Sequence, residues 1–137
     1  MPKRLPLNRR QLEGIAGSIL KCLKISQEWS ISVTFMDDRQ IRILNKKYLG
    51  HNKATDVLAF DYSENTADIA ISLETAQKNA AFYKNTYKNE LILYIIHGFL
   101  HIFGYDDTTE KTKKRMDKKQ EELFEKVRDG SRIENRP

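Results

Sequence analysis

Apolar residues near the start of the chain recur with the spacing of one helix face. Asn8, with Gln11 three residues later, forms a capping-box start. The stripe that follows keeps the i, i+3, i+4, i+7 spacing and comprises Leu12, Ile15, Ala16, Ile19, Leu20 and Leu23. From residue 31 the period changes to two, because Ile31, Val33 and Phe35 alternate with serine, threonine and methionine. The pattern predicts a helix followed by a strand with one buried face.

The middle of the chain predicts a second helix, a hairpin and a third helix. Asp37 or Asp38 can cap the second helix, and Gly50 ends it. Residues 57–60 and 68–71 are short apolar strands on either side of a Ser-Glu-Asn turn signal. Alanine and tyrosine then recur at helical spacing, which indicates the third helix.

The most apolar segment runs from Leu91 to Phe103 and is hydrophobic nearly all round. A surface helix would carry a polar face, so we expect a buried central helix here. Gly104 can supply the left-handed residue that ends it. Together the elements predict an α+β domain in which helices cover a small mixed β-sheet.

Composition limits the class of protein. The chain has 137 residues, of which 39% are hydrophobic and 31% charged, so we expect residues 1–137 to form a single ordered domain. No apolar run approaches the roughly 18 residues of a membrane span, and no secretory h-region is evident. Cys22 is the one cysteine, which excludes an intramolecular disulfide and a cysteine-based zinc cluster. We therefore expect a cytoplasmic protein.

Positive charge is unevenly distributed along the chain. Lysine and arginine number 24 against 19 acidic residues, a formal charge of +5. Residues 111–119 hold six basic side chains against one acid, and the first ten residues hold Lys3, Arg4, Arg9 and Arg10 without an acid. Such clusters indicate a polyanionic partner, nucleic acid first. A solvated helix face is the alternative interpretation.

Two histidines lie inside the most apolar segment. His97 and His101 are four residues apart and therefore share one face of a helix. HxxxH spacing lets two imidazoles reach one metal ion, and two core histidines bonded to other groups are the alternative. Gly98 stands where a zinc protease of the HExxH type carries its general base, which speaks against a peptidase. Asp106 and Asp107 follow the helix with carboxylates that can complete a site.

Three motifs carry a resemblance to a known family. The run of residues 97–107, His-Gly-Phe-Leu-His-Ile-Phe-Gly-Tyr-Asp-Asp, resembles the HGxLHLxGYDH signature of the YbeY family. Residues 44–60 resemble the family pattern LNxxYRGxxxPTDVLSF, and residues 67–72 resemble GDIxIS. These proteins are metal-dependent endoribonucleases of ribosomal RNA maturation, and the resemblance implies that activity for this chain.

The resemblance implies a metal centre at the histidine pair. His97 and His101 fall on two histidine ligands of the family, and Asp107 falls on the third. Two imidazoles and a carboxylate form an open site for one divalent ion, which we expect to be Zn²⁺, although the set is also typical of Fe(II). Asp107 can instead cap the last helix, with Glu110 three residues later, and Asp106 can cap or ligate.

Other family positions indicate RNA contacts and show two departures. Leu49 replaces an arginine thought to face the RNA phosphate, and Ala54 replaces a proline. Asp56 matches a family aspartate that can orient water or a histidine nitrogen; a turn aspartate bonded to its own backbone is the alternative. We expect the RNA-binding cations to include Lys46, Lys47, His51, Lys53, Lys111 and Lys114.

The resemblance thus predicts a single-strand-specific, metal-dependent endoribonuclease that acts in ribosome biogenesis, at the 3′ end of small-subunit rRNA. Its expected partners are ribosomal RNA and the ribosome or small-subunit precursor, with no membrane. Because Leu49 cannot hold a phosphate, one alternative is a non-catalytic or weakened RNA-binding assembly factor with a structural metal. A metal hydrolase of another substrate class is the other.

Overall fold

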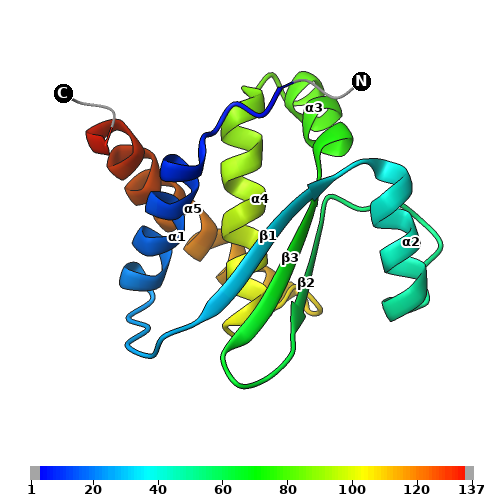
Figure 1. Cartoon of the computed structure of the whole chain (residues 1–137), viewed down its shortest axis with the longest axis horizontal. Coiled ribbons are helices and arrows are strands. Elements are labelled where there is room, and N and C mark those ends of the chain that lie inside the picture. The colour runs from blue at the N-terminus through cyan, green and yellow to red at the C-terminus, as the bar shows by residue number, and fades with distance from the viewer. Residues whose placement is uncertain (1–3, 135–137) are drawn as a thin grey trace.

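The structure, a computed structural model, describes residues 4–134 as five helices around a three-stranded sheet (Figure 1). The elements follow in the order α1 (Arg9–Cys22), β1 (Ser30–Met36), α2 (Asp38–Leu49), β2 (Val57–Asp61), β3 (Thr66–Ser72), α3 (Leu73–Phe82), α4 (Tyr87–Ile102) and α5 (Glu110–Glu134). This order confirms the predicted α+β class. Residues 1–3, which include Lys3 of the basic N-terminal cluster, and residues 135–137 of the predicted domain lie outside the described residues.

Side-chain caps set the helix starts. Asn8 accepts the N–H of Gln11 at 2.8 Å and begins α1, as the capping-box pattern predicts. Asp37, and not Asp38, caps α2, because its Oδ1 accepts the N–H of Gln40 at 2.8 Å. The Asp38 carboxylate accepts the hydroxyl of Thr75 at 2.6 Å and so ties α2 to α3. The central helix α4 begins earlier than its apolar run, at Tyr87, after a threonine N-cap.

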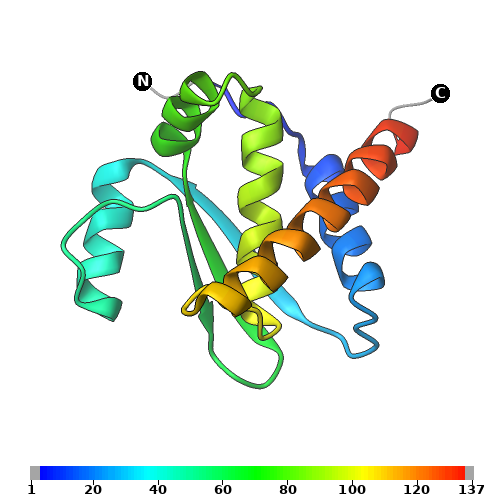
Figure 2. The same cartoon turned by 180° about the vertical axis from the view of Figure 1, so that it is seen from behind.

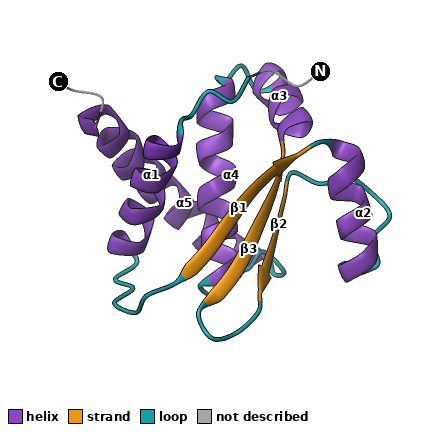
Figure 3. Ribbon diagram, in the orientation of Figure 1, coloured by secondary structure: helices purple, strands orange, loops and turns teal. Residues whose placement is uncertain are grey.

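The sheet has the strand order β1-β3-β2, with β1 parallel and β2 antiparallel to the central strand β3 (Figure 3). The hairpin between β2 and β3 turns through three consecutive residues with positive φ: Ser63 at 77°, Glu64 at 51° and Asn65 at 57°. This is the turn that the Ser-Glu-Asn signal predicts, and it leaves β2 as an edge strand.

The helices cover the two faces of the sheet unequally. The larger core joins α1, α4 and α5 to one face, where β3 contributes Ile69 and Ile71. Ala70, whose side chain points to the opposite face, packs with Ile41 of α2 and Leu58 of β2 in a smaller core. From behind, α4 is seen to cross the sheet with α5 lying over it (Figure 2). The buried central helix is therefore confirmed.

A glycine lets α4 approach the sheet closely. Gly98 is buried, and a Cβ at this position would lie 2.7 Å from Cγ2 of Ile69 on β3. That distance is well inside van der Waals contact, so only glycine fits without a shift of the helix or the strand. The approach sets the height above the sheet of the helical turn that carries His97 and His101.

Within residues 4–134, no helix combines the length and the apolar character that crossing a membrane requires.

Candidate metal centre

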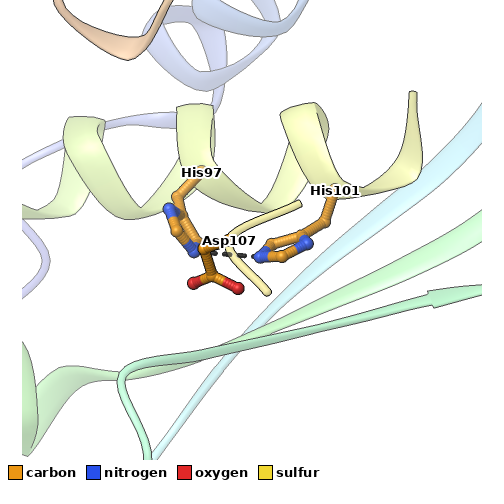
Figure 4. Close-up of side chains that lie close together, drawn as sticks. All are labelled: His97, His101 and Asp107. Carbon is orange, nitrogen blue, oxygen red and sulfur yellow. Dashed lines mark hydrogen bonds between the residues drawn. The ribbon is translucent and has the colours of Figure 1, made fainter. Parts of the chain in front are cut away.

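One face of α4 presents two imidazole rings to each other. The Nε2 atoms of His97 and His101 lie 3.1 Å apart, and the ring centroids are separated by 4.7 Å. Both side chains are half-buried. The i, i+4 spacing on a regular helix brings the rings together one turn apart, edge to face with their planes 74° from parallel (Figure 4).

The loop after α4 brings a carboxylate to the pair. Gly104 adopts a φ of 95°, and the N–H of Tyr105 donates to the carbonyl of Leu100 at 2.9 Å, which ends the helix in a left-handed turn. The chain then reverses, so that Asp107 lies beside both histidines (Figure 4). One ligand atom from each of His97, His101 and Asp107 lies within 4.8 Å of the other two.

The neighbouring acid and hydroxyl groups have structural roles in the same loop. Thr109, and not Asp107, occupies the N-cap position of α5, because its Oγ1 accepts the N–H of Thr112 at 3.1 Å. The alternative interpretation of Asp107 as a helix cap is therefore wrong. Asp106 Oδ1 accepts the N–H of Thr108 at 3.1 Å and its hydroxyl at 2.9 Å. Hydrogen bonds from Thr112 and Thr108 hold the pKa of Asp106 below its usual value, which keeps this carboxylate ionised within its own turn.

The geometry and protonation of the cluster fit a divalent metal ion. Two nitrogens bound at about 2.0–2.1 Å to a tetrahedral ion lie roughly 3.3 Å apart, close to the 3.1 Å between the imidazoles. Burial lowers the pKa of His101 below 6.5, and His97 lowers it further, against the opposing effects of Asp107, Asp106 and Asp56. His101 is therefore neutral at pH 7, the form that ligates a metal.

Gln120 of α5 contacts the histidine pair, and the sequence interpretation missed it. Its Oε1 lies 3.1 Å from Nδ1 of His97, and because an amide oxygen can only accept, Nδ1 donates. This tautomer leaves the lone pair on Nε2, directed at His101. One signal pointed to it: Gln120 interrupts the buried stripe of α5 formed by Met116, Leu123 and Val127, and a polar residue on such a stripe requires a partner.

Replacing Gln120 with leucine is expected to weaken metal binding about 10- to 100-fold, the usual cost of losing an outer partner of a ligating histidine. Gln120→Glu keeps an acceptor for His97 Nδ1 and is the matched control, expected to bind metal at least as tightly as the parent. Competition with a chromogenic chelator measures both affinities. Equal affinities for the leucine and glutamate variants would contradict the role assigned to Gln120.

The remaining predicted residues lie at three places. Asp56 precedes β2, where its Oδ1 accepts the N–H of Val57 at 2.8 Å, as a turn aspartate does, while its charge also acts on His101. Leu49, at the end of α2, is 53% exposed and packs in neither core. The predicted RNA-binding cations divide between the end of α2 with its following loop and the first turns of α5: Lys46, Lys47, His51 and Lys53, and then Lys111 and Lys114.

Comparison with known proteins identifies the family. The family model for Endoribonuclease YbeY matches residues 3–128. This chain belongs to the YbeY family. YbeY relatives are similar over most of their length: the Endoribonuclease YbeY of Desulforamulus reducens is 35% identical, with 85% of this chain and 84% of the relative covered. That of Acholeplasma laidlawii is 38% identical, with 85% and 87% covered.

A solved structure agrees with this assignment to YbeY. The solution structure of TM1509 from Thermotoga maritima superposes with a TM-score of 0.66 at 27% identity, and the match covers 96% of this chain and 90% of that one. YbeY is a metal-dependent family, and the cluster of His97, His101 and Asp107 is a possible metal site in this member.

Proposed function

We propose that this protein is a metal-dependent endoribonuclease of ribosomal RNA maturation, with His97, His101 and Asp107 as the metal ligands. The observation that carries the proposal is the convergence of these three donors within 4.8 Å, in a chain whose relatives are named Endoribonuclease YbeY. We propose Zn²⁺ as the ion. We also propose that the protein acts in the cytoplasm on the 3′ end of small-subunit rRNA, with the ribosome or its precursor as its partner.

The protein's own residues have separate tasks in this chemistry. A bound divalent ion supplies Lewis acidity, which lowers the pKa of a coordinated water towards ~7 and polarises a phosphoryl oxygen. The two half-buried imidazoles offer their Nε2 atoms as ligands, and Gln120 orients the first of them. Asp107 is exposed and contributes a negative charge on the solvent side. Because Asp107 is exposed and both histidines project from α4, a long phosphodiester would approach the cluster from the side of Asp107.

Cleavage of defined RNAs tests the proposal. Purified protein, with its metal content measured, would be incubated with a small-subunit rRNA 3′-end precursor and with a duplex of the same length. We expect chelator-sensitive cleavage of the single-stranded RNA, with the products mapped by primer extension. A metal-replete protein that leaves both RNAs intact would refute the nuclease function. Cleavage of an unstructured peptide in the same preparation would favour a different hydrolase.

Phosphate contacts should make RNA affinity depend on salt. Lys46 and Lys47 line a surface pocket at the end of α2, and each phosphate neutralised on a single strand contributes about 0.7 to the slope of log affinity against log salt. The double variant Lys46→Gln, Lys47→Gln is therefore expected to reduce this slope by about 1.4. Fluorescence anisotropy from 50 to 300 mM salt, about a sixfold span, measures it. Lys21→Gln on α1 is the control, and an unchanged slope in the double variant would remove these lysines from the RNA path.

A further inference from the structure

Three aromatic rings gather at the β2 edge of the sheet, one from the end of α2 and two from the end of β2 and the residue after it. We call Tyr48, Phe60 and Tyr62 the aromatic edge. The ring centroids of Tyr48 and Phe60 are 5.3 Å apart. Those of Phe60 and Tyr62 are 6.5 Å apart, with their planes only 16° from parallel. Phe60 belongs to β2, and Tyr62 follows Asp61, the last residue of that strand, so the two rings come from positions i and i+2 where the strand ends.

Two of the three residues of the aromatic edge are exposed and belong to neither hydrophobic core. Phe60 is half-buried and packs against the smaller core. Tyr48 and Tyr62, in contrast, are exposed residues, at 55% and 54%. The hydroxyl of Tyr62 donates to Asp68 Oδ2 at 3.1 Å, which holds the ring in place on the sheet. The tyrosine side chains are therefore accessible from solvent, and the bond to Asp68 fixes the orientation of Tyr62. Adjacent large aromatic side chains that are exposed in this way are typical of an interaction surface.

Positive charge borders the same surface. The ammonium of Lys47 lies 5.2 Å from the centroid of the Tyr48 ring. Lys47 also lines a pocket of about 470 Å³ together with Arg42, Lys46, Ile43 and Asn52. Aromatic faces beside cations match the two chemical parts of a single-stranded nucleic acid, because bases stack on the rings while phosphates pair with the cations. An apolar protein partner would have no comparable use for the cations, so charge complementarity favours RNA.

We propose that the aromatic edge is a base-stacking subsite, in which Tyr48 and Tyr62 hold an unpaired base of the RNA while Lys46 and Lys47 bind its flanking phosphates. The inference rests on the proposed endoribonuclease function and extends it, because it adds a binding site outside the metal centre. Recognition by stacking tolerates any base sequence but requires an unpaired base, since a base within a duplex has no free face. The subsite therefore supplies a physical basis for a preference for single strands.

Paired substitutions separate the ring from its hydroxyl. The double variant Tyr48→Leu, Tyr62→Leu removes both rings but keeps apolar bulk. Tyr48→Phe, Tyr62→Phe keeps both rings and loses the same hydroxyls, including the bond to Asp68. Tyr83→Leu removes another tyrosine ring, 67% exposed, at the end of α3 and controls for surface aromatics in general. The probes are a single-stranded RNA containing 2-aminopurine, an abasic strand with the same number of phosphates, and a duplex.

Loss of stacking is expected to weaken single-stranded RNA binding at least tenfold in the double leucine variant. The 2-aminopurine quenching seen with the parent should disappear, whereas the slope of affinity against salt should be unchanged because the lysines remain. Tyr83→Leu should behave like the parent, and the phenylalanine variant should lose much less affinity than the double leucine variant, because it keeps both rings and loses only the bond to Asp68 that orients Tyr62. Affinity for the abasic strand should be equal in all four proteins.

The outcomes distinguish this subsite from the endoribonuclease function itself. If the parent cleaves RNA and the double leucine variant binds the 2-aminopurine strand as tightly as the parent, the subsite is refuted while the nuclease stands. Equal loss in the leucine and phenylalanine variants would also overturn it, because the hydroxyls and not the rings would then be responsible. If the parent binds RNA with base-dependent quenching but cleaves none, the subsite stands and the proposed enzymatic function fails.

Discussion

His101→Ala is expected to lower the rate of RNA cleavage by at least about a hundredfold, since loss of an outer partner alone typically costs 10- to 100-fold and this change removes a proposed ligand. His97 and Asp107 would remain, and two donors hold a divalent ion far less tightly than three. The imidazole is half-buried at the last turn of α4, so its removal should leave the fold intact. Metal content per protein and the initial rate of cleavage measure the two effects together.

Metal-stripped parent protein is the matched control for this variant. Its rate should fall to that of His101→Ala, and added Zn²⁺ should restore the parent but not the variant. Circular dichroism of both proteins would establish that they remain folded. A His101→Ala protein that keeps its metal and its rate would rule out the three-donor site.

Gly98→Glu is expected to lower the free energy of unfolding by about 4 kcal/mol or more, because it combines overpacking with the burial of a charge. A Cβ alone would meet Ile69 Cγ2 at 2.7 Å, and that methyl belongs to a buried, β-branched side chain of β3 that has little room to move. The substitution would complete an HExxH sequence on α4. We expect it to produce an unstable protein without peptidase activity, as measured by urea unfolding and a peptide assay.

Gly17 provides the comparison within the same chain. It also lies inside a helix, α1, but a Cβ there meets nothing within 4 Å. Gly17→Glu should therefore leave stability unchanged or raise it by up to about 1 kcal/mol through helix propensity. Equal stabilities for the two glutamate variants would show that the approach of α4 to β3 does not constrain position 98.

Local interactions explain why so much of the fold could be predicted from the residues alone. Helix and strand periods depend on contacts three, four or two positions apart, and caps such as Asn8 with Gln11 involve one turn of chain. The histidine pair belongs to the same category, because i, i+4 spacing on a helix places two rings together wherever that helix lies. The positions of the eight elements and the HxxxH face were therefore readable without any knowledge of packing.

Contacts between segments distant in the chain were decided only by the tertiary structure. Asp106 and Asp107 are neighbouring residues of the same type, so the sequence could not tell which of them reaches the histidines. In the structure, the turn after Gly104 directs Asp107 to the histidines, while Asp106 bonds to Thr108. From the sequence, glycine at position 98 shows only that the general base of a zinc peptidase is missing. The fold adds the reason that position 98 is a glycine, because a larger side chain there would collide with Ile69 of β3. Gln120 meets His97 across 23 residues.

The aromatic edge likewise joins a helix end to a strand end. Sequence alone determined which short segments form helices and strands and which histidines share a face, because those properties depend on nearest neighbours along the chain. Tertiary packing decided which carboxylate and which amide stand beside those histidines, and which rings form the aromatic edge, because side chains far apart in sequence meet only once the whole core has formed.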